Sequence, residues 1–145
     1  MKVTVLGSGG WGTALALVLL ENGHDVSLWS FSREEYEAIA AHRENPMLKG
    51  VALPEALHLT YDMNAAADCG VVVLATPSFA VRTTARKLKS IVKPGTVLVS
   101  VAKGIEDAVS AELKVKVVIG IGTVVSHVRD LARAYQEAQM AIEVG

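Results

Sequence analysis

The fold of this chain is decided near its start, by Val3-Thr4-Val5-Leu6 followed directly by Gly7-Ser8-Gly9-Gly10-Trp11-Gly12. The first four residues are typical of a short buried strand. The next six fit the pattern G-x-G-x-x-G, which in the turn between a strand and a helix is the fingerprint of a dinucleotide site. The helix is predicted from Gly10 to Asn22 and is apolar nearly all round, which predicts that it is buried.

Each of the three pattern glycines has a separate physical task. Gly7 allows the sharp turn out of the strand, and Gly12 lets the helix pack closely on that strand. Gly9 lacks a Cβ, so the backbone at this point can approach a pyrophosphate. The pyrophosphate would lie at the start of the helix, where free N–H groups and the helix dipole favour an anion. The alternative is a glycine turn with a purely structural role.

Outward from this motif, short apolar runs alternate with helical patterns. Further strands are predicted at 26–29, 57–60, 71–75, 97–101 and 115–121, and further helices at 32–42, 64–67, 79–91, 107–113 and 126–144. The second helix starts with a plausible capping box, Ser32 with Glu35. Such alternation predicts a Rossmann-type, doubly wound α/β fold, with a mostly parallel sheet and helices on both faces. We expect residues 1–145 to form a single domain.

Composition excludes several classes of protein. The chain has 145 residues, of which 51% are hydrophobic and 20% charged, so it is not disordered. Its 14 basic and 15 acidic residues give a net charge of −1, which does not suit a nucleic-acid binder. One cysteine and four scattered histidines indicate neither a disulfide nor a metal site. Without a targeting or membrane-spanning segment, we expect a soluble, cytoplasmic protein that does not bind membranes.

The cofactor preference is less clear from the sequence. An acid usually follows the second strand and binds the ribose 2′-hydroxyl of NAD. Here Ser30, Phe31, Ser32 and Arg33 follow Trp29, and none of them is acidic. The two hydroxyls and Arg33 could accommodate the 2′-phosphate of NADP, with no carboxylate to repel it. The alternative is that Arg33 is merely an exposed residue in the first turn of a helix.

From Met1 to about Asp107, the sequence resembles the bacterial NAD(P)-dependent glycerol-3-phosphate dehydrogenases. The motifs that carry this resemblance are Gly9 to Ala16, Leu28-Trp29, Glu44-Asn45-Pro46 with Leu53-Pro54, Ala75 to Ser78, and Val101 to Glu106. The resemblance implies NADP or NAD as the cofactor and dihydroxyacetone phosphate or glycerol 3-phosphate as the substrate of the complete enzyme.

The resemblance also implies roles for particular residues. It implies that Gly10 and Trp11, in the cofactor loop, contact the cofactor and that Pro77 lies near the nicotinamide. Lys103 stands where the family has a lysine that contacts both cofactor and substrate. Phe31 stands where the family often has Arg or His, which leaves the choice of cofactor open. The family's proton acceptor belongs to a substrate domain absent here, so we expect no catalytic residue and little or no activity from this chain alone.

Beyond Asp107 the pattern changes. Residues 115–145 are similar to the end of the GGDEF-like domain in sugar-diacid and purine-catabolism transcription regulators. We therefore expect a chimera, in which a foreign strand and helix within 108–145 complete the dehydrogenase-like part, residues 1–107. A natural truncated homologue is the alternative origin. Alternative functions are an artificial fusion without ligand or activity, and a module that forms a homodimer through the tail.

Overall fold

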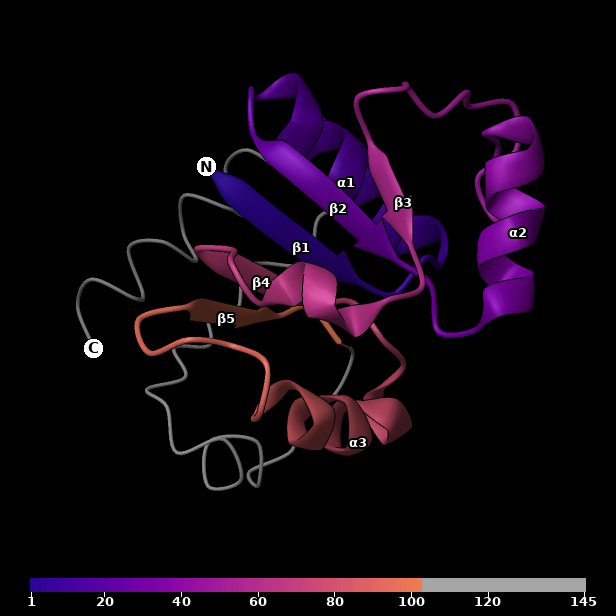
Figure 1. Cartoon of the computed structure of the whole chain (residues 1–145). Helices are drawn as coiled ribbons and strands as arrows, with labels where there is room; N and C mark the ends of the chain where they lie inside the picture. Colours follow the sequence, from indigo (N-terminus) through magenta and orange to yellow (C-terminus); the bar gives the residue numbers. More distant parts are fainter. Residues whose placement is uncertain (103–145) are drawn as a thin grey trace.

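A computed structural model describes residues 1–102, which form one parallel sheet with helices around it (Figure 1). The strands are β1 (Lys2–Leu6), β2 (Asp25–Trp29), β3 (His58–Thr60), β4 (Val71–Leu74) and β5 (Val97–Ser100). The helices are α1 (Gly10–Glu21), α2 (Arg33–His42), the 3-10 turn η1 (Met63–Ala66) and α3 (Ser78–Leu88). The helices predicted at 107–113 and 126–144 and the strand at 115–121 lie outside the described residues.

The five strands have the order β3-β2-β1-β4-β5, and every pairing is parallel. In the central strand, Leu6 pairs with Trp29 of β2 on one side and with Leu74 of β4 on the other. The carboxyl ends of these three strands therefore lie at one edge of the sheet. This arrangement confirms the predicted Rossmann-type fold, and ligands of such sheets bind at that edge.

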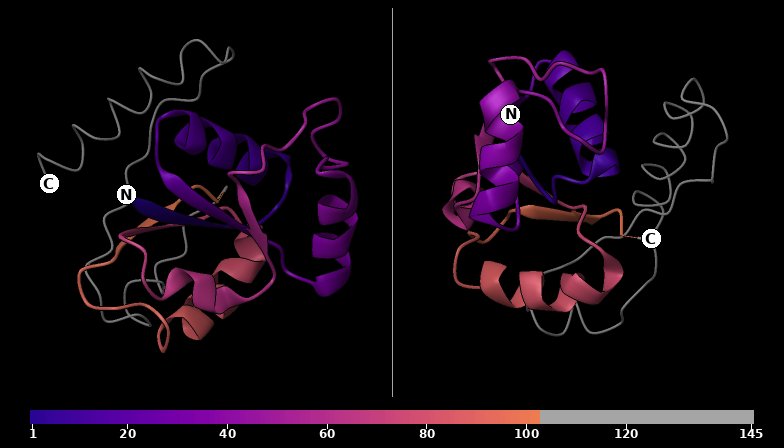
Figure 2. Two further views of the ribbon diagram at one scale, coloured as in Figure 1. Left: turned by 45° about the horizontal axis from the view of Figure 1, so that its top comes forward. Right: turned by 90° about the vertical axis from the view of Figure 1, so that its right-hand side faces the viewer.

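Helices cover both faces of the sheet, with α1 and α3 on opposite sides (Figure 2). Side chains alternate along each strand, so Leu6 packs toward α3 whereas Val5 packs toward α1. On the α3 face, Leu6 belongs to a core with Val81 and Leu88. On the other face, Val5 shares a core with Ala16 of α1 and Ile39 of α2. Both cores are mainly aliphatic, as expected for strands buried on two sides, and the core on the α3 face also contains Trp29.

The prediction that α1 is buried is wrong in part. Its buried residues are Gly12, Thr13 and Ala16, which form the side that faces the sheet. Trp11 is 49% exposed and Val18 is 45% exposed on the opposite side. A helix beside a sheet can bury only one stripe unless a further layer covers it, so apolar composition all round does not itself produce full burial.

Two other predicted helices differ in detail from the structure. The helix predicted at 79–91 ends at Leu88, and the N–H groups of Ile91 and Val92 then donate to the Leu88 carbonyl in a closing turn. The single turn predicted at 64–67 is the 3-10 helix η1, which Asp62 caps by accepting from the N–H of Asn64. No helix within residues 1–102 is long and apolar enough to cross a membrane.

Candidate cofactor-binding site

The glycine-rich loop leaves β1 at the carboxyl edge of the sheet in the way that its sequence predicts. Gly7 has φ +120°, a conformation that side chains other than glycine rarely adopt. A Cβ at this position would lie 2.7 Å from the carbonyl oxygen of Ala75. The N–H of Gly7 donates to the carbonyl of Trp29 at 3.0 Å. The turn is thereby fixed against the ends of both β2 and β4.

The remaining glycines divide into two that are tightly packed and one that is open. A Cβ at Gly12 would lie 2.0 Å from the carbonyl oxygen of Gly7, so the helix approaches the strand as closely as the motif predicts. A Cβ at Gly10 would lie 2.9 Å from the carbonyl oxygen of Met47. A Cβ at Gly9 would meet nothing within 4 Å. The backbone at Gly9 is therefore the part of the loop that a ligand can approach.

The first turn of α1 presents uncapped N–H groups beside this open glycine. Gly9 is the N-cap and supplies no side-chain hydrogen bond, and the first turn contains no acidic residue. The helical hydrogen bonds start with the N–H of Thr13, which donates to the Gly9 carbonyl at 2.9 Å. The N–H groups that precede it point out of the helix end, where an anion is favoured.

A buried amide, which belongs to the Glu44-Asn45-Pro46 motif but was not predicted as a site residue, holds this loop in place. Asn45 is 1% exposed, and its Nδ2 donates to the carbonyl of Ser8 at 2.7 Å and to Oγ1 of Thr13 at 2.6 Å. Its Oδ1 accepts the N–H of Met47 at 2.9 Å. Asn45 therefore ties the loop to the first turn of α1, and both its amide nitrogen and its amide oxygen have hydrogen-bond partners.

A second polar group joins the loop to the end of β2. The hydroxyl of Ser8 lies 2.7 Å from Oε1 of Glu35 and 2.8 Å from Oγ of buried Ser30. The Ser8 hydroxyl has a single proton to donate, and a hydrogen bond to a charged carboxylate is stronger than one to another hydroxyl. Ser8 therefore donates to Glu35 and accepts from Ser30. The other carboxylate oxygen, Oε2, accepts the N–H of Phe31 at 3.2 Å.

This position of Glu35 corrects two expectations. The capping box forms only in part: Ser32 Oγ accepts the N–H of Glu35 at 3.1 Å, but the Glu35 carboxylate bonds to Phe31 instead of returning to Ser32. The expectation that no carboxylate lies near the end of β2 is wrong, because α2 brings one there. No signal close in sequence indicates this contact, since Ser8 and Glu35 are 27 positions apart.

The other residues predicted at the end of β2 lie on its exposed side. Phe31 is 69% exposed and packs edge-to-face on Trp29, with ring centroids 6.1 Å apart. Arg33 donates from Nε to Glu37 Oε1 at 2.8 Å. The hydrogen bond that Arg33 donates to Glu37, helped by the negative charge of Glu37, raises the pKa of Arg33. Lys87 of α3 has its Nζ 5.9 Å from the centre of the Phe31 ring.

The turn after β4 forms the opposite side of this edge. Pro77 is exposed at the N-cap of α3, and Phe79 in the first turn is 86% exposed. Thr76 is only 5% exposed, yet its hydroxyl has no hydrogen-bond partner within the described residues. A buried hydroxyl without a partner is costly. A polar ligand that reaches this turn could supply the missing bond.

The structure thus brings most of the predicted site residues to one edge of the sheet. They are Gly7, Gly9, Gly10, Trp11, Gly12, Ser30, Phe31, Arg33 and Pro77. Lys103 lies outside the described residues. Exposed Phe79 and buried Thr76 and Asn45 were missed as site residues, although their positions beside predicted turns could have suggested them.

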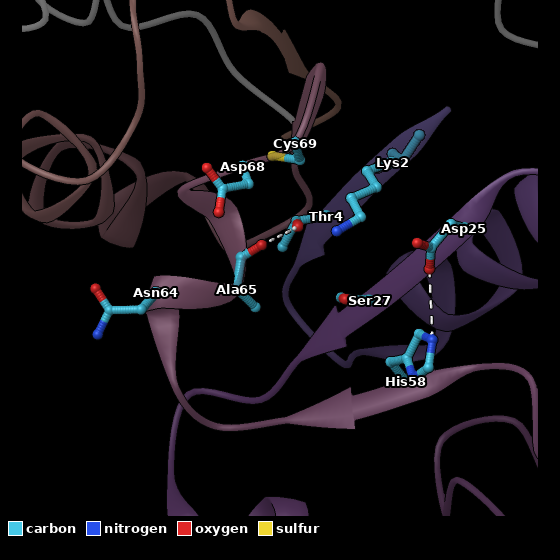
Figure 3. A pocket seen from close by; sticks show the side chains of 10 residues that line it. Lys2, Thr4, Asp25, Ser27, His58, Asn64, Ala65, Asp68 and Cys69 are labelled. Atoms are coloured by element: carbon cyan, nitrogen blue, oxygen red, sulfur yellow. Dashed lines mark hydrogen bonds and ion pairs between the residues drawn. The ribbon is translucent and has the colours of Figure 1, made fainter.

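A hollow of about 310 Å³ lies away from this edge, between η1 and the first half of β1 and β2 (Figure 3). Exposed polar and charged groups flank it, and among them Oδ1 of Asp25 lies 3.4 Å from Nε2 of His58. Thr4 donates across its floor to the Ala65 carbonyl at 3.0 Å. No group of three or more metal-ligating side chains occurs in residues 1–102. The hollow has no glycine-rich loop and only the four-residue 3-10 helix η1 beside it, so the carboxyl edge is the stronger candidate site.

Comparison with known proteins gives a consistent result. A family model described as the NAD-dependent glycerol-3-phosphate dehydrogenase N-terminus matches residues 2–120, which extends past the expected end of the resemblance at Asp107. A glycerol-3-phosphate dehydrogenase [NAD(P)+] of Fusobacterium nucleatum is 40% identical over 126 residues, covering 80% of this chain and 38% of that protein. One of Prosthecochloris aestuarii is 47% identical over 108 residues, covering 73% of this chain and 32% of that protein.

Solved structures agree with these sequence relatives. The glycerol-3-phosphate dehydrogenase of Coxiella burnetii matches with a TM-score of 0.76 and 26% identity, over 95% of this chain and 43% of that one. The enzyme of Saccharomyces cerevisiae matches with a TM-score of 0.75 and 27% identity, over 96% of this chain and 44% of that one. The chain spans about a third of the length of the curated relatives it matches.

Proposed function

The chain belongs to the family of NAD-dependent glycerol-3-phosphate dehydrogenase N-terminal domains, and from this premise we propose that it binds NAD(H) or NADP(H) at the carboxyl edge of its sheet. The observation that carries the proposal is the open backbone at Gly9 beside the uncapped start of α1. The N–H groups of Gly10 and Trp11 would bind the pyrophosphate, and the dipole of α1 would favour its negative charge.

The two ends of the dinucleotide would then lie on either side of this loop. We place the adenosine half over the end of β2, where Ser30, Phe31 and Arg33 would contact it. We place the nicotinamide half by Pro77, where the hydroxyl of Thr76 could gain the partner that it lacks. Lys103 would contact both cofactor and substrate, a role that rests on the family resemblance alone.

The reaction of the longer relatives would require more than this chain. When bound, the nicotinamide exchanges hydride with C2 of dihydroxyacetone phosphate or glycerol 3-phosphate, and the protein orients it. We propose that residues 1–102 contribute cofactor binding and orientation to that reaction. We further propose that residues 108–145 complete the single domain, and that it functions in the cytoplasm. Their origin in a regulator-like domain, and a homodimer formed through them, stay hypotheses that sizing chromatography and a structure of the tail would test.

The test is a titration of the full chain with NADH and NADPH, followed by tryptophan fluorescence. Trp11 adjoins the proposed pyrophosphate site and is half exposed, whereas Trp29 is buried with its Nε1 donating to the Tyr61 carbonyl at 2.9 Å. We expect saturable quenching that comes mainly from Trp11. The variant Trp11→Phe should lose most of the signal and retain binding by calorimetry. Absence of saturable binding of both cofactors would contradict the proposal.

A further inference from the structure

We propose that Glu35 makes this site prefer NAD(H) over NADP(H), an inference that rests on the proposed function. In a Rossmann fold, the ribose of the adenosine half lies between the glycine loop and the end of the second strand. Glu35 bonds to both of these segments, to Ser8 through Oε1 at 2.7 Å and to the N–H of Phe31 through Oε2 at 3.2 Å. Its carboxylate therefore occupies the crevice in which an acid from the second strand would normally act.

The hydrogen-bonding capacity of the carboxylate fits a ribose diol. An ionised carboxylate accepts at about four lone-pair positions. Two of these positions are used, by the Ser8 hydroxyl and by the Phe31 N–H. The others remain available to the 2′- and 3′-hydroxyls of NAD. Glu35 is partly exposed, so a ligand can reach it without opening the core.

The 2′-phosphate of NADP would meet the same carboxylate with the wrong sign of charge. A phosphate monoester carries a charge of about −1.5 to −2 at neutral pH, and it offers acceptors where Glu35 also offers acceptors. Like charges held within a few ångströms repel strongly unless a cation lies between them. The Ser8 hydroxyl and the Phe31 N–H hold the carboxylate at this place, so it cannot swing away without breaking both hydrogen bonds.

The nearby cations do not reverse this preference. Arg33, which the sequence suggested as a phosphate ligand, already donates to Glu37 at 2.8 Å, so its charge is locally balanced. Lys87 lies over the Phe31 ring, 5.9 Å from its centre, and attracts any phosphate that comes near. Lys87 is a single flexible cation, whereas the Glu35 carboxylate is held by two donors. We therefore expect repulsion to dominate at the 2′ position.

The experiment measures the dissociation constants of NADH and NADPH on the full chain and on three variants. For the parent, we expect NADH to bind about tenfold more tightly than NADPH. E35Q keeps the shape and removes the charge, so the ratio of the two constants should fall to about one. E34Q is the matched control, because it removes the same charge from the neighbouring exposed position of α2, and its ratio should stay within about twofold of the parent.

The outcomes separate this inference from the proposed function. If both cofactors bind but E35Q has the same ratio as the parent, Glu35 does not select and the inference is overturned, whereas the binding site stands. A parent that binds NADPH as tightly as NADH overturns the inference without any variant. If neither cofactor binds the parent, both proposals fail. Should E35Q fold poorly, E35D keeps the charge, and a ratio near one for that folded variant would equally contradict a role for charge.

Discussion

Replacing Asn45 with alanine should destabilise the domain well beyond what the removal of an ordinary loop side chain does. The amide joins three separate pieces of backbone and side chain, at Ser8, Thr13 and Met47, with donor–acceptor distances of 2.6 to 2.9 Å. At 1% exposure, no water can take over these bonds without a rearrangement of the loop. Asn45→Ala therefore removes the amide partner of the Ser8 carbonyl, the Thr13 hydroxyl and the Met47 N–H, and leaves the first two only their long mutual bond of 3.4 Å.

The size of the effect follows from the number of bonds. A net protein hydrogen bond contributes about 1 kcal/mol, and a buried group left unsatisfied costs about 1–3 kcal/mol. Three lost bonds therefore give about 3 kcal/mol. A domain of this size is stabilised by only about 5–15 kcal/mol in total. The change should thus remove a large fraction of the free energy of unfolding.

Urea unfolding of the full chain, followed by the fluorescence of buried Trp29, measures this loss directly. We expect a lower urea midpoint and an unchanged slope of the unfolding free energy against urea concentration. An unchanged slope means that unfolding exposes the same amount of surface, so the lower midpoint reports lower stability. Asn64→Ala is the control, because Asn64 is an exposed amide whose side chain bonds, among residues 1–102, only to the exposed Asp62. It should change stability by less than about 0.5 kcal/mol. An Asn45→Ala variant as stable as this control would refute the reasoning.

Further predictions concern the loop, an ion pair and the tail. Gly12→Ala should lower the melting temperature strongly, because its Cβ would lie 2.0 Å from a backbone oxygen and overpacking costs about 1–3 kcal/mol or more. Gly9→Val should bind NADH at least about tenfold more weakly, because the side chain fills the approach to the pyrophosphate, yet it should stay as stable as the parent. The hydrogen bond from Lys93 lowers the pKa of Asp68. Lys93→Met should therefore cost a little stability at neutral pH. This cost should disappear as the pH falls through the lowered pKa of Asp68, because the carboxylate is then protonated. A chain that ends at Asp107 should aggregate or melt earlier than the full chain. It would lack the strongly apolar residues 115–121, and with them the burial that we propose the tail adds to the domain.

The glycine and ion-pair predictions have internal controls. Gly70→Ala should be mild, since its Cβ would find its nearest neighbour at 3.9 Å. A Gly12→Ala variant no less stable than Gly70→Ala would mean that the close approach of helix and strand is not needed. If Gly9→Val binds NADH as well as the parent does, the loop is not the pyrophosphate site. A cost of Lys93→Met that persists in acid would assign the effect to packing instead of charge.

The strands and helices of residues 1–102 could be predicted to within a few residues because their signals are local. Val3 to Leu6, which are apolar except for Thr4, and the apolar residues Val72 to Leu74 are buried on both faces, and their largely apolar character predicts this. The glycine pattern is equally local, since the φ of Gly7 and the contact of Gly12 depend on the turn itself. Hence the fold and the place of the candidate site followed from the sequence.

The polar contacts that shape the site could not be predicted in the same way. The bond from Asn45 to the Ser8 carbonyl spans 37 positions, and the bond from Ser8 to Glu35 spans 27. Their partners become neighbours only once the parallel sheet has brought the ends of β1 and β2 together. Local rules assigned Glu35 to a capping box, and the tertiary structure gave its carboxylate to the glycine loop instead. The consequence is a carboxylate beside the glycine loop, where the sequence indicated only hydroxyls and Arg33.

The most direct test of the central claim is the mapping of NADH-induced shifts in the backbone amide resonances of the full chain. We predict the largest shifts at the amides of Gly9, Gly10 and Trp11, with smaller ones after β2 and β4, and little change at Lys2, Asp25 and His58, which line the other hollow. Saturable shifts concentrated at those three hollow residues, with Gly9 to Trp11 unmoved, would contradict the claim that the glycine loop binds the cofactor.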